Sequence, residues 1–135
     1  MKNPENVVIR RGDYRAPGFL VQRVELLFDL ESTLTRVEST LTLRRNPASG
    51  AADRLVLFGD GLTLETIALN HRPLSPDSYT RASDRITLNA EMLTREGETA
   101  ILTVVTTFNP SANLALEGLY VTNDTFCTQC EAEGF

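Results

Sequence analysis

The residues best able to do chemistry gather in the last nine positions of the chain, CTQCEAEGF. This run holds two thiols, one amide and two carboxylates: Cys127, Cys130, Gln129, Glu131 and Glu133. A C-x-x-C pair can bind zinc or act as a redox dithiol, and a carboxylate can accept charge-assisted hydrogen bonds from a cation. The segment is therefore the first candidate for a functional site.

The two cysteines lack the company that zinc binding or redox chemistry requires. A structural zinc site needs four ligands, usually two such pairs or one pair with two histidines, and the chain has one histidine. A thioredoxin-type dithiol needs a strand-to-helix turn in a βαβ context, which the sequence does not indicate. We expect Cys127 and Cys130 to be reduced thiols that are structural or line a site, with metal binding and redox work as weaker alternatives.

The remaining polar candidates are explained by turns. His71 lies in NHRPLSP, a turn with two prolines, which favours a solvated surface residue, and Asp60 and Asp77 lie in clusters where a carboxylate caps its own backbone. A single histidine excludes the H-E-x-x-H zinc motif, and no G-x-S-x-G elbow, P-loop or dinucleotide fingerprint is present. We expect no catalytic residue and no metal ligand in this chain, and the chain alone to be inactive.

Alternation of apolar and polar residues with period two is the dominant pattern that must position these groups. It is clearest over residues 34–44, where it predicts a half-buried strand. The run 20–30 alternates in the same way, and the ESTLT segment links the two runs as a hairpin or meander. The side chains expected on the apolar faces are Val24, Leu26, Phe28, Leu30, Val37, Ser39, Leu41 and Leu43.

Further strands are expected at residues 54–58, 62–69, 85–89 and 100–108, with turn residues between them. No segment keeps helical spacing over three turns, although DRITLNAEMLT allows one short helical turn. The pattern predicts an all-β fold, an antiparallel β-sandwich or saddle-like pair of sheets. With 135 residues the chain has the length of one domain with one core.

Composition and charge exclude several classes of protein. The formal net charge is -5 and no Lys/Arg cluster is interleaved with aromatic residues, so nucleic acid is not expected as a partner. No run approaches 18 apolar residues, and the N-terminal stretch lacks the apolar core of an export signal. We therefore expect no membrane span and a cytoplasmic location.

The run NPSANLALEGLYVTNDTFCTQCEAEGF, residues 109–135, resembles the corresponding stretch of the bacterial aminopeptidase N family, zinc exopeptidases of the gluzincin type. DYRAP at 13–17 and LLFDL at 26–30 resemble the start of the same proteins in the same order. The resemblance implies that residues 1–135 are an N-terminal β-domain, truncated before its end and before the zinc catalytic domain. The G-A-M-E-N and H-E-x-x-H motifs of that catalytic domain are not in this sequence, so zinc is expected in the full-length parent and none in this chain.

The resemblance also assigns roles within the tail, because the Q-C-E loop of the family maps onto Gln129, Cys130 and Glu131. It implies that Glu131 helps hold the free α-ammonium of the substrate and that Gln129 lines the pocket for the first side chain. Cys130 has no assigned role, and Glu133 is expected to be a solvated acidic residue. The implied partners are peptide N-termini and the parent's own catalytic domain.

A second hypothesis from a different class remains open. The chain could be a stand-alone β-sandwich module that binds a protein or a sugar and has no enzymatic activity. The absence of Trp and the 7% aromatic content count against a sugar platform, whereas an exposed edge strand could recruit a peptide. A reading frame that continues into the zinc motifs would separate the two hypotheses.

Overall fold

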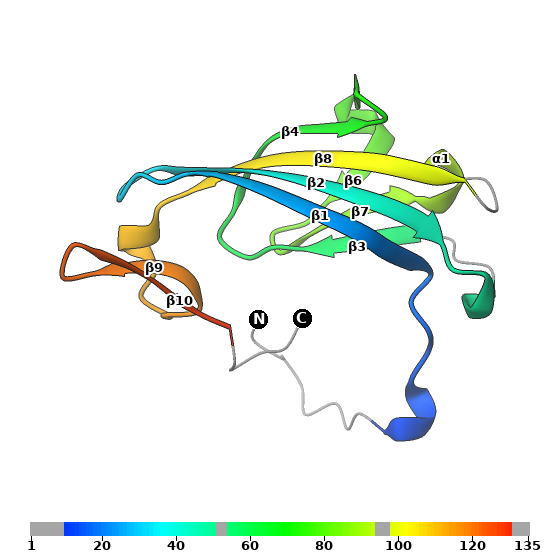
Figure 1. Ribbon diagram of the computed structural model, residues 1–135, viewed down its shortest axis with the longest axis horizontal. Helices are drawn as coiled ribbons and strands as arrows, with labels where there is room; N and C mark the ends of the chain where they lie inside the picture. Colours follow the sequence, from blue (N-terminus) through cyan, green and yellow to red (C-terminus); the bar gives the residue numbers. More distant parts are fainter. Residues whose placement is uncertain (1–9, 51–53, 94–97, 131–135) are drawn as a thin grey trace.

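The structure is a computed structural model that describes residues 10–50, 54–93 and 98–130. Its elements run in chain order as β1 (Phe19–Asp29), β2 (Thr35–Arg45), β3 (Arg54–Phe58), β4 (Thr63–Leu69), β5 (Arg72–Pro73), β6 (Tyr79–Arg81), β7 (Arg85–Asn89), α1 (Ala90–Leu93), β8 (Thr99–Phe108), β9 (Gly118–Thr122) and β10 (Thr125–Gln129) (Figure 1). Four 3-10 turns complete the list: η1 (Arg11–Asp13), η2 (Pro47–Ser49), η3 (Pro76–Ser78) and η4 (Pro110–Ala112). In the described part of the chain no helix is long and apolar enough to cross a membrane.

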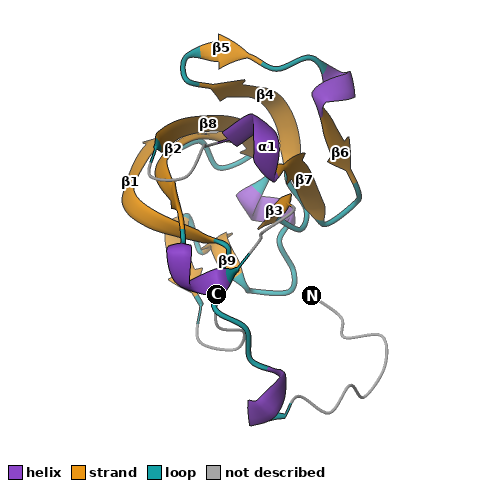
Figure 2. Ribbon diagram, turned by 90° about the vertical axis from the view of Figure 1, so that its right-hand side faces the viewer, coloured by secondary structure: helices purple, strands orange, loops and turns teal. Residues whose placement is uncertain are grey.

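The strands of the described residues form three antiparallel sheets. The large sheet has the order β1-β2-β8-β4-β5, the small sheet has the order β3-β7-β6, and β9 pairs with β10 alone. Figure 2 shows the large sheet curving over the small one, with α1 at one end between them. The predicted all-β antiparallel fold is confirmed, and every strand expected from the alternation is present within two residues of its predicted bounds.

Register places the apolar positions of the large sheet on one face. Leu41 lies opposite Val24 on β1 and opposite Leu102 on β8, and Leu43 lies opposite Val21 and Ala100. The other face carries polar residues, such as Arg36, whose guanidinium lies 3.6 Å from Glu38 and 3.4 Å from Glu65. The two faces predicted from period two are therefore confirmed.

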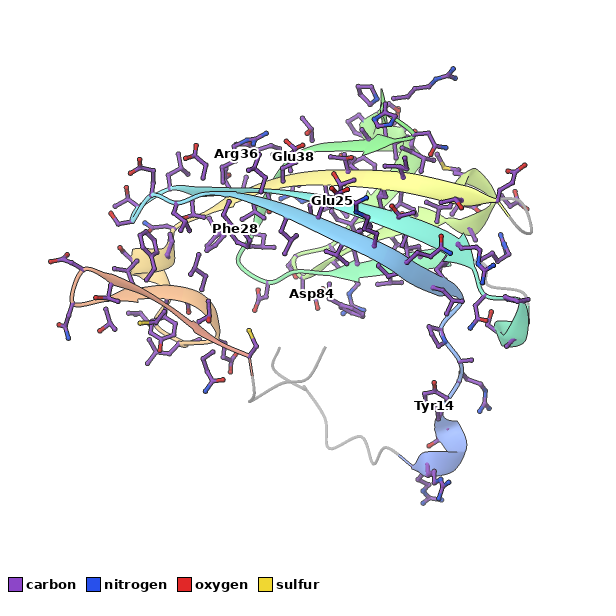
Figure 3. All side chains as sticks on the ribbon, viewed as in Figure 1. Tyr14, Glu25, Phe28, Arg36, Glu38 and Asp84 are labelled. Atoms are coloured by element: carbon purple, nitrogen blue, oxygen red, sulfur yellow. The ribbon has the colours of Figure 1, made fainter. Side chains whose placement is uncertain are left out.

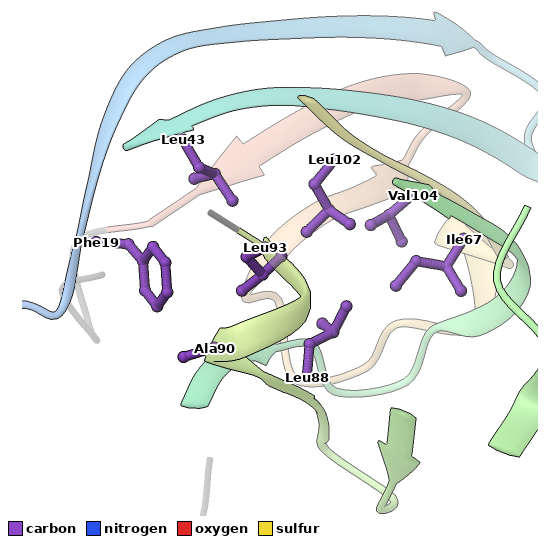
Figure 4. Close-up of a cluster of buried hydrophobic side chains, with 8 residues drawn as sticks. All are labelled: Phe19, Leu43, Ile67, Leu88, Ala90, Leu93, Leu102 and Val104. Atoms are coloured by element: carbon purple, nitrogen blue, oxygen red, sulfur yellow. The ribbon is translucent and has the colours of Figure 1, made fainter. Parts of the chain in front are cut away.

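The core lies between the inner face of the large sheet and the elements β7 and α1. Its buried members are Phe19, Leu43, Ile67, Leu88, Ala90, Leu93, Leu102 and Val104 (Figure 4). The one helical turn allowed by the sequence is α1, and it is present because Ala90 and Leu93 both enter this core. Burying several large apolar side chains is the main favourable term that holds the two sheets together.

Two short strands, β5 and β6, were not predicted. They have two and three residues, which is too few for an alternation to be recognised. Pairing with longer neighbours creates them, since β5 pairs with β4 across the turn at Asn70 and His71, and β6 pairs with β7. The φ angles of Asn70 and His71 are 49° and 65°, the left-handed pair that a two-residue hairpin turn requires.

Candidate functional site

The first three residues of the candidate tail, 127–129, belong to an ordered β-hairpin. β9 and β10 pair over five residues each and are joined by Asn123 and Asp124, whose φ angles are 48° and 58°. Asn and Asp tolerate left-handed backbone better than other residues with a side chain, which makes this dipeptide suitable for a tight hairpin turn. The Asn-Asp pair was the signal in the sequence that could have revealed the hairpin.

Asn113 holds the base of the hairpin and was not singled out from the sequence. Its side-chain amide nitrogen donates to the carbonyl oxygens of Glu117 at 2.7 Å and Leu119 at 3.0 Å. Its side-chain oxygen accepts from the backbone N–H of Leu116 at 3.2 Å. One side chain thus closes the loop before β9 and fixes where β9 begins.

The turn η4 ties the hairpin to the large sheet. Ser111 donates from its hydroxyl to the carbonyl oxygen of Ser32 at 2.6 Å, and its backbone N–H donates to the same oxygen at 3.1 Å. Ser32 belongs to the linker between β1 and β2. Because η4 directly follows β8 and precedes Asn113, the hairpin is positioned by the rim of the sandwich.

A cavity of about 430 Å³ lies where the hairpin base meets the sandwich. Residues from the β3–β4 loop, the end of β8, η4 and β9 line it, among them Asp60, Leu62, Phe108, Asn113, Glu117 and Gly118. Gly118 is also the register partner of Gln129 on β10. Asp60, which the sequence explained as a turn residue, therefore lies at this cavity as well as in its turn.

Cys127 lies on β10, and Cys130 follows the end of that strand. Residues 127–129 are extended, and three residues of strand span about 10 Å, whereas a disulfide needs Cα atoms about 4 to 7 Å apart. Both thiols are free, Cys127 half-buried and Cys130 exposed, and the Cys127 Sγ lies 3.8 Å from the carbonyl oxygen of Thr125. Over residues 10–50, 54–93 and 98–130 no three His, Cys, Asp or Glu side chains come together as a metal site would require.

The other candidate residues are dispersed. Gln129 is exposed at the end of β10, while Glu131 and Glu133 lie outside the described residues. His71 is an exposed turn residue next to β5, and Figure 2 shows β5 at the opposite side of the sandwich from β9. Asp77 lies in the exposed turn η3. Gln129 and Cys130 are consecutive in the sequence, whereas His71 and Asp77 lie in turns beside β5 and β6.

Electrostatics single out one pair away from the hairpin. A bidentate hydrogen bond from Arg85, 2.8 Å for each contact, lowers the pKa of Asp84 below its ordinary value. The same contact raises the pKa of Arg85, whose guanidinium also lies 5.5 Å from the centre of the Phe58 ring. Figure 3 shows Asp84 on the side of the small sheet. This exposed ion pair is explained by surface structure and marks no second site.

Comparison with known sequences gives relatives along the whole chain. Aminopeptidase N of Caulobacter vibrioides is 38% identical over 135 residues, all of this chain and 15% of that protein. Aminopeptidase N of Escherichia coli is 37% identical over 125 residues, 93% of this chain and 13% of that protein. The chain therefore spans about one seventh of the length of these relatives. Comparison with descriptions of protein families gives no match.

Solved structures with the same fold come from similar enzymes. Legionella pneumophila aminopeptidase A, in complex with aspartic acid, matches with a TM-score of 0.79 at 23% identity over 91% of this chain and 14% of that chain. A variant of the M1 zinc metallopeptidase from Deinococcus radiodurans, bound to a Tyr-Ser-Ala substrate, matches with a TM-score of 0.66 at 18% identity over 87% of this chain and 27% of that chain. The resemblance expected from the tail is confirmed: over its whole length this chain is similar to a segment of proteins named aminopeptidase N, and its fold is that of the corresponding part of solved aminopeptidases.

Proposed function

We propose that this chain is the N-terminal β-domain, cut before the end of that domain, of a zinc-dependent aminopeptidase that releases N-terminal residues from peptides. The observation that carries the proposal is the 38% identity to an aminopeptidase N over all 135 residues. A domain that matches from end to end, including an unusual tail, supports a shared role in the full-length protein. The peptide substrates, the zinc, the catalytic domain as a partner and the cytoplasmic location are parts of this proposal.

Zinc in the full-length protein would be held outside this chain. A catalytic zinc site uses three protein ligands with an open position, and the chain has one histidine, which lies in an exposed turn. Cys127 lies on β10 and Cys130 just beyond it, and among the described residues no three His, Cys, Asp or Glu side chains gather to hold a metal ion. In this proposal the zinc ligands come from the rest of the full-length protein, and this chain contributes binding and orientation.

The role that suits the tail is recognition of the substrate's free amine. A carboxylate accepts charge-assisted hydrogen bonds from an ammonium, and an acceptor fixed at one end of the site selects peptides by their free N-terminus. In this proposal Glu131 is such an acceptor. Gln129, two residues earlier, lines the pocket for the first side chain, where its amide can both donate and accept.

The hairpin gives this role a physical basis. Gln129 lies on a strand whose register with Gly118 is set by a two-residue turn at one end, with the Asn113 contacts bracing β9 at the other. A group that must meet an ammonium within hydrogen-bond distance benefits from such support, because loose positioning weakens both binding and orientation. The β9–β10 hairpin would therefore carry the Gln129–Glu131 run toward the catalytic domain.

The experiment that tests the amine anchor uses the full-length enzyme and its kcat/KM for an aminoacyl amide. Glu131→Ala should lower kcat/KM by roughly 30-fold to a few thousand-fold, since truncating one partner of a desolvated charge pair costs about 2 to 5 kcal/mol. Glu131→Gln keeps the shape and a neutral acceptor, so its kcat/KM should fall between those of the wild type and the Ala variant. Zinc content should be unchanged, because Glu131 is not expected to be a ligand.

The matched control is Glu133→Ala, which removes the same group two residues further along and should leave kcat/KM nearly unchanged. Gln129→Ala is expected to change the ranking of substrates with different first side chains more than it changes activity on any one of them. An effect of Glu131→Ala below about twofold, which is under 0.5 kcal/mol, would rule out the amine anchor. Stoichiometric zinc and turnover in the 135-residue chain would rule out the wider proposal.

A further inference from the structure

An apolar patch lies on the inner face of β1 beyond the core. Val24, Leu26 and Phe28 are 53%, 53% and 47% exposed, although their register partners on β2 are Leu41, Ser39 and Val37. Leu41 packs against the core, so these three side chains lie on the face of the sheet that is otherwise buried. Figure 3 shows Phe28 on the opposite side of the sheet from Arg36 and Glu38.

The core covers only the first part of this face. Phe19, at the start of β1, is 7% exposed because Ala90 and Leu93 of α1 belong to the same cluster. Isolated exposed apolar residues are ordinary, but three at successive inward positions of one strand form a contiguous patch of the kind that marks an interface. A period-two pattern that places apolar residues inward predicts a face that another element buries. This stretch of β1 has the pattern, but no described element packs over it.

β3 is the edge strand of the small sheet on the side that faces the exposed apolar patch of β1. β3 pairs with β7 on one side, and among the described residues no strand pairs with its other side. Leu55 and Leu57 of β3 pack against the core, so β3 lies on the same side of the large sheet as the patch. In Figure 2 the small sheet runs from β6 through β7 to β3 and stops there, on the side toward β1.

We propose that a β-strand from the remainder of the full-length polypeptide pairs with the open edge of β3 and covers Val24, Leu26 and Phe28. A strand added there would lie about 4.8 Å from β3, and facing sheets pack about 10 Å apart, so its inward side chains would meet the patch. Relatives of which this chain covers 13% to 15% have ample polypeptide to supply such a strand. The inference rests on the proposal that this chain is part of a longer protein.

The size and composition of the patch predict the length and the residue pattern of the covering strand. The patch extends over five residues of β1, about 14 Å, so the covering strand needs at least five residues. It should alternate, with apolar residues facing the patch, because the patch offers no charged group at its three inward positions. Edge pairing would also give hydrogen-bond partners to the backbone groups on the edge of β3 that no described strand pairs with, which side-chain contacts alone would not do.

The test compares Leu26→Cys with Leu27→Cys, two neighbouring positions of β1 that face opposite sides of the sheet. The rate of labelling by a thiol reagent is followed by mass spectrometry of the separated peptides, which keeps Cys127 and Cys130 out of the measurement. In the full-length protein Leu26→Cys should react about tenfold more slowly or slower still than in the 135-residue chain, since labelling then needs local opening. Leu27→Cys, 65% exposed in this structure, should react alike in both.

Hydrogen exchange of residues 54–58, which form β3, tests whether the element that covers the patch also pairs with β3. Slower exchange of β3 amides in the full-length protein, together with slow labelling of Leu26→Cys, is the expected result. Equal labelling in both proteins would overturn the proposal, as would slow labelling without any change in β3 exchange. Protection in the 135-residue chain that grows with protein concentration would assign the patch to a second copy instead. None of these readouts depends on aminopeptidase activity, so they remain informative if the proposed function fails.

Discussion

Replacing Asn113 with Ala tests whether one side chain holds the candidate hairpin in place. The substitution removes three hydrogen bonds, to Glu117, Leu119 and Leu116, while leaving the β9–β10 ladder and its turn unchanged. Two of these bonds are exposed and one, to Leu119, is partly buried. With about 0.5 kcal/mol for each exposed bond and about 1 kcal/mol for the partly buried one, the loss is about 2 kcal/mol.

This loss should appear locally, because the hairpin forms a sheet of its own and the core lies elsewhere. Native-state hydrogen exchange, read by mass spectrometry on peptides covering residues 118–129, should speed up by about 30-fold, the factor that corresponds to about 2 kcal/mol of local opening. Exchange of β2 and β8 should stay unchanged. Asn113→Asp keeps the acceptor for Leu116 but loses both donors, so its hairpin should exchange at an intermediate rate.

A change below about twofold in the exchange of residues 118–129 would refute this reasoning, because it would mean that the clamp contributes less than about 0.5 kcal/mol. Equal acceleration in the hairpin and in β8 would refute it differently, by showing that the hairpin opens only with the whole domain. In the full-length enzyme Asn113→Ala should lower kcat/KM through the position of the Gln129–Glu131 run, and zinc content should not change.

Three further results are expected. Leu102→Ala should lower the free energy of unfolding by about 2 to 5 kcal/mol in urea titration, since Leu102 is fully buried, whereas Leu27→Ala on the exposed face should cost under about 0.5 kcal/mol. His71→Gly should leave stability unchanged or raise it, because the turn needs a left-handed residue there, while His71→Val should lower it by about 1 to 2 kcal/mol; a loss of stability with Gly would show that the imidazole makes a contact of its own. Arg85→Gln should lower the melting temperature slightly near neutral pH and not at all in strong acid: the Asp84 pKa is lowered from 3.8, so the stabilisation is present above that value and is lost as pH falls through the lowered pKa. An equal effect of Arg85→Gln at both pH values would assign it to the contact with Phe58.

Sequence patterns predicted the long strands because each carries its own evidence. β1 and β2 alternate between apolar and polar residues over most of their length, and β8 combines alternation with β-branched residues, so each strand could be recognised locally, even β1, most of whose side chains are exposed. The hairpin was missed although Asn123 and Asp124 favour a tight turn, because its strands alternate weakly between apolar and polar residues. Gln129 and Cys130 were named from their residue types, and the role of Gln129 came from the resemblance, whereas Asn113 was found only when its contacts were seen.

What the sequence by itself determined is the all-β class, the two faces of the main strands and the similarity to aminopeptidase N, because these depend on residue order alone. Which strands pair, and in what order, depended on tertiary structure: the order β1-β2-β8-β4-β5 joins segments more than 60 residues apart, as the contact between Thr40 and Thr103 illustrates. The tertiary structure also decided which apolar side chains are buried. Phe19 and Phe28 have the same apolar character on the same strand, yet α1 buries the first, and nothing in the described chain buries the second. A side chain's burial is set by what packs across from it, and only the folded chain brings that partner near.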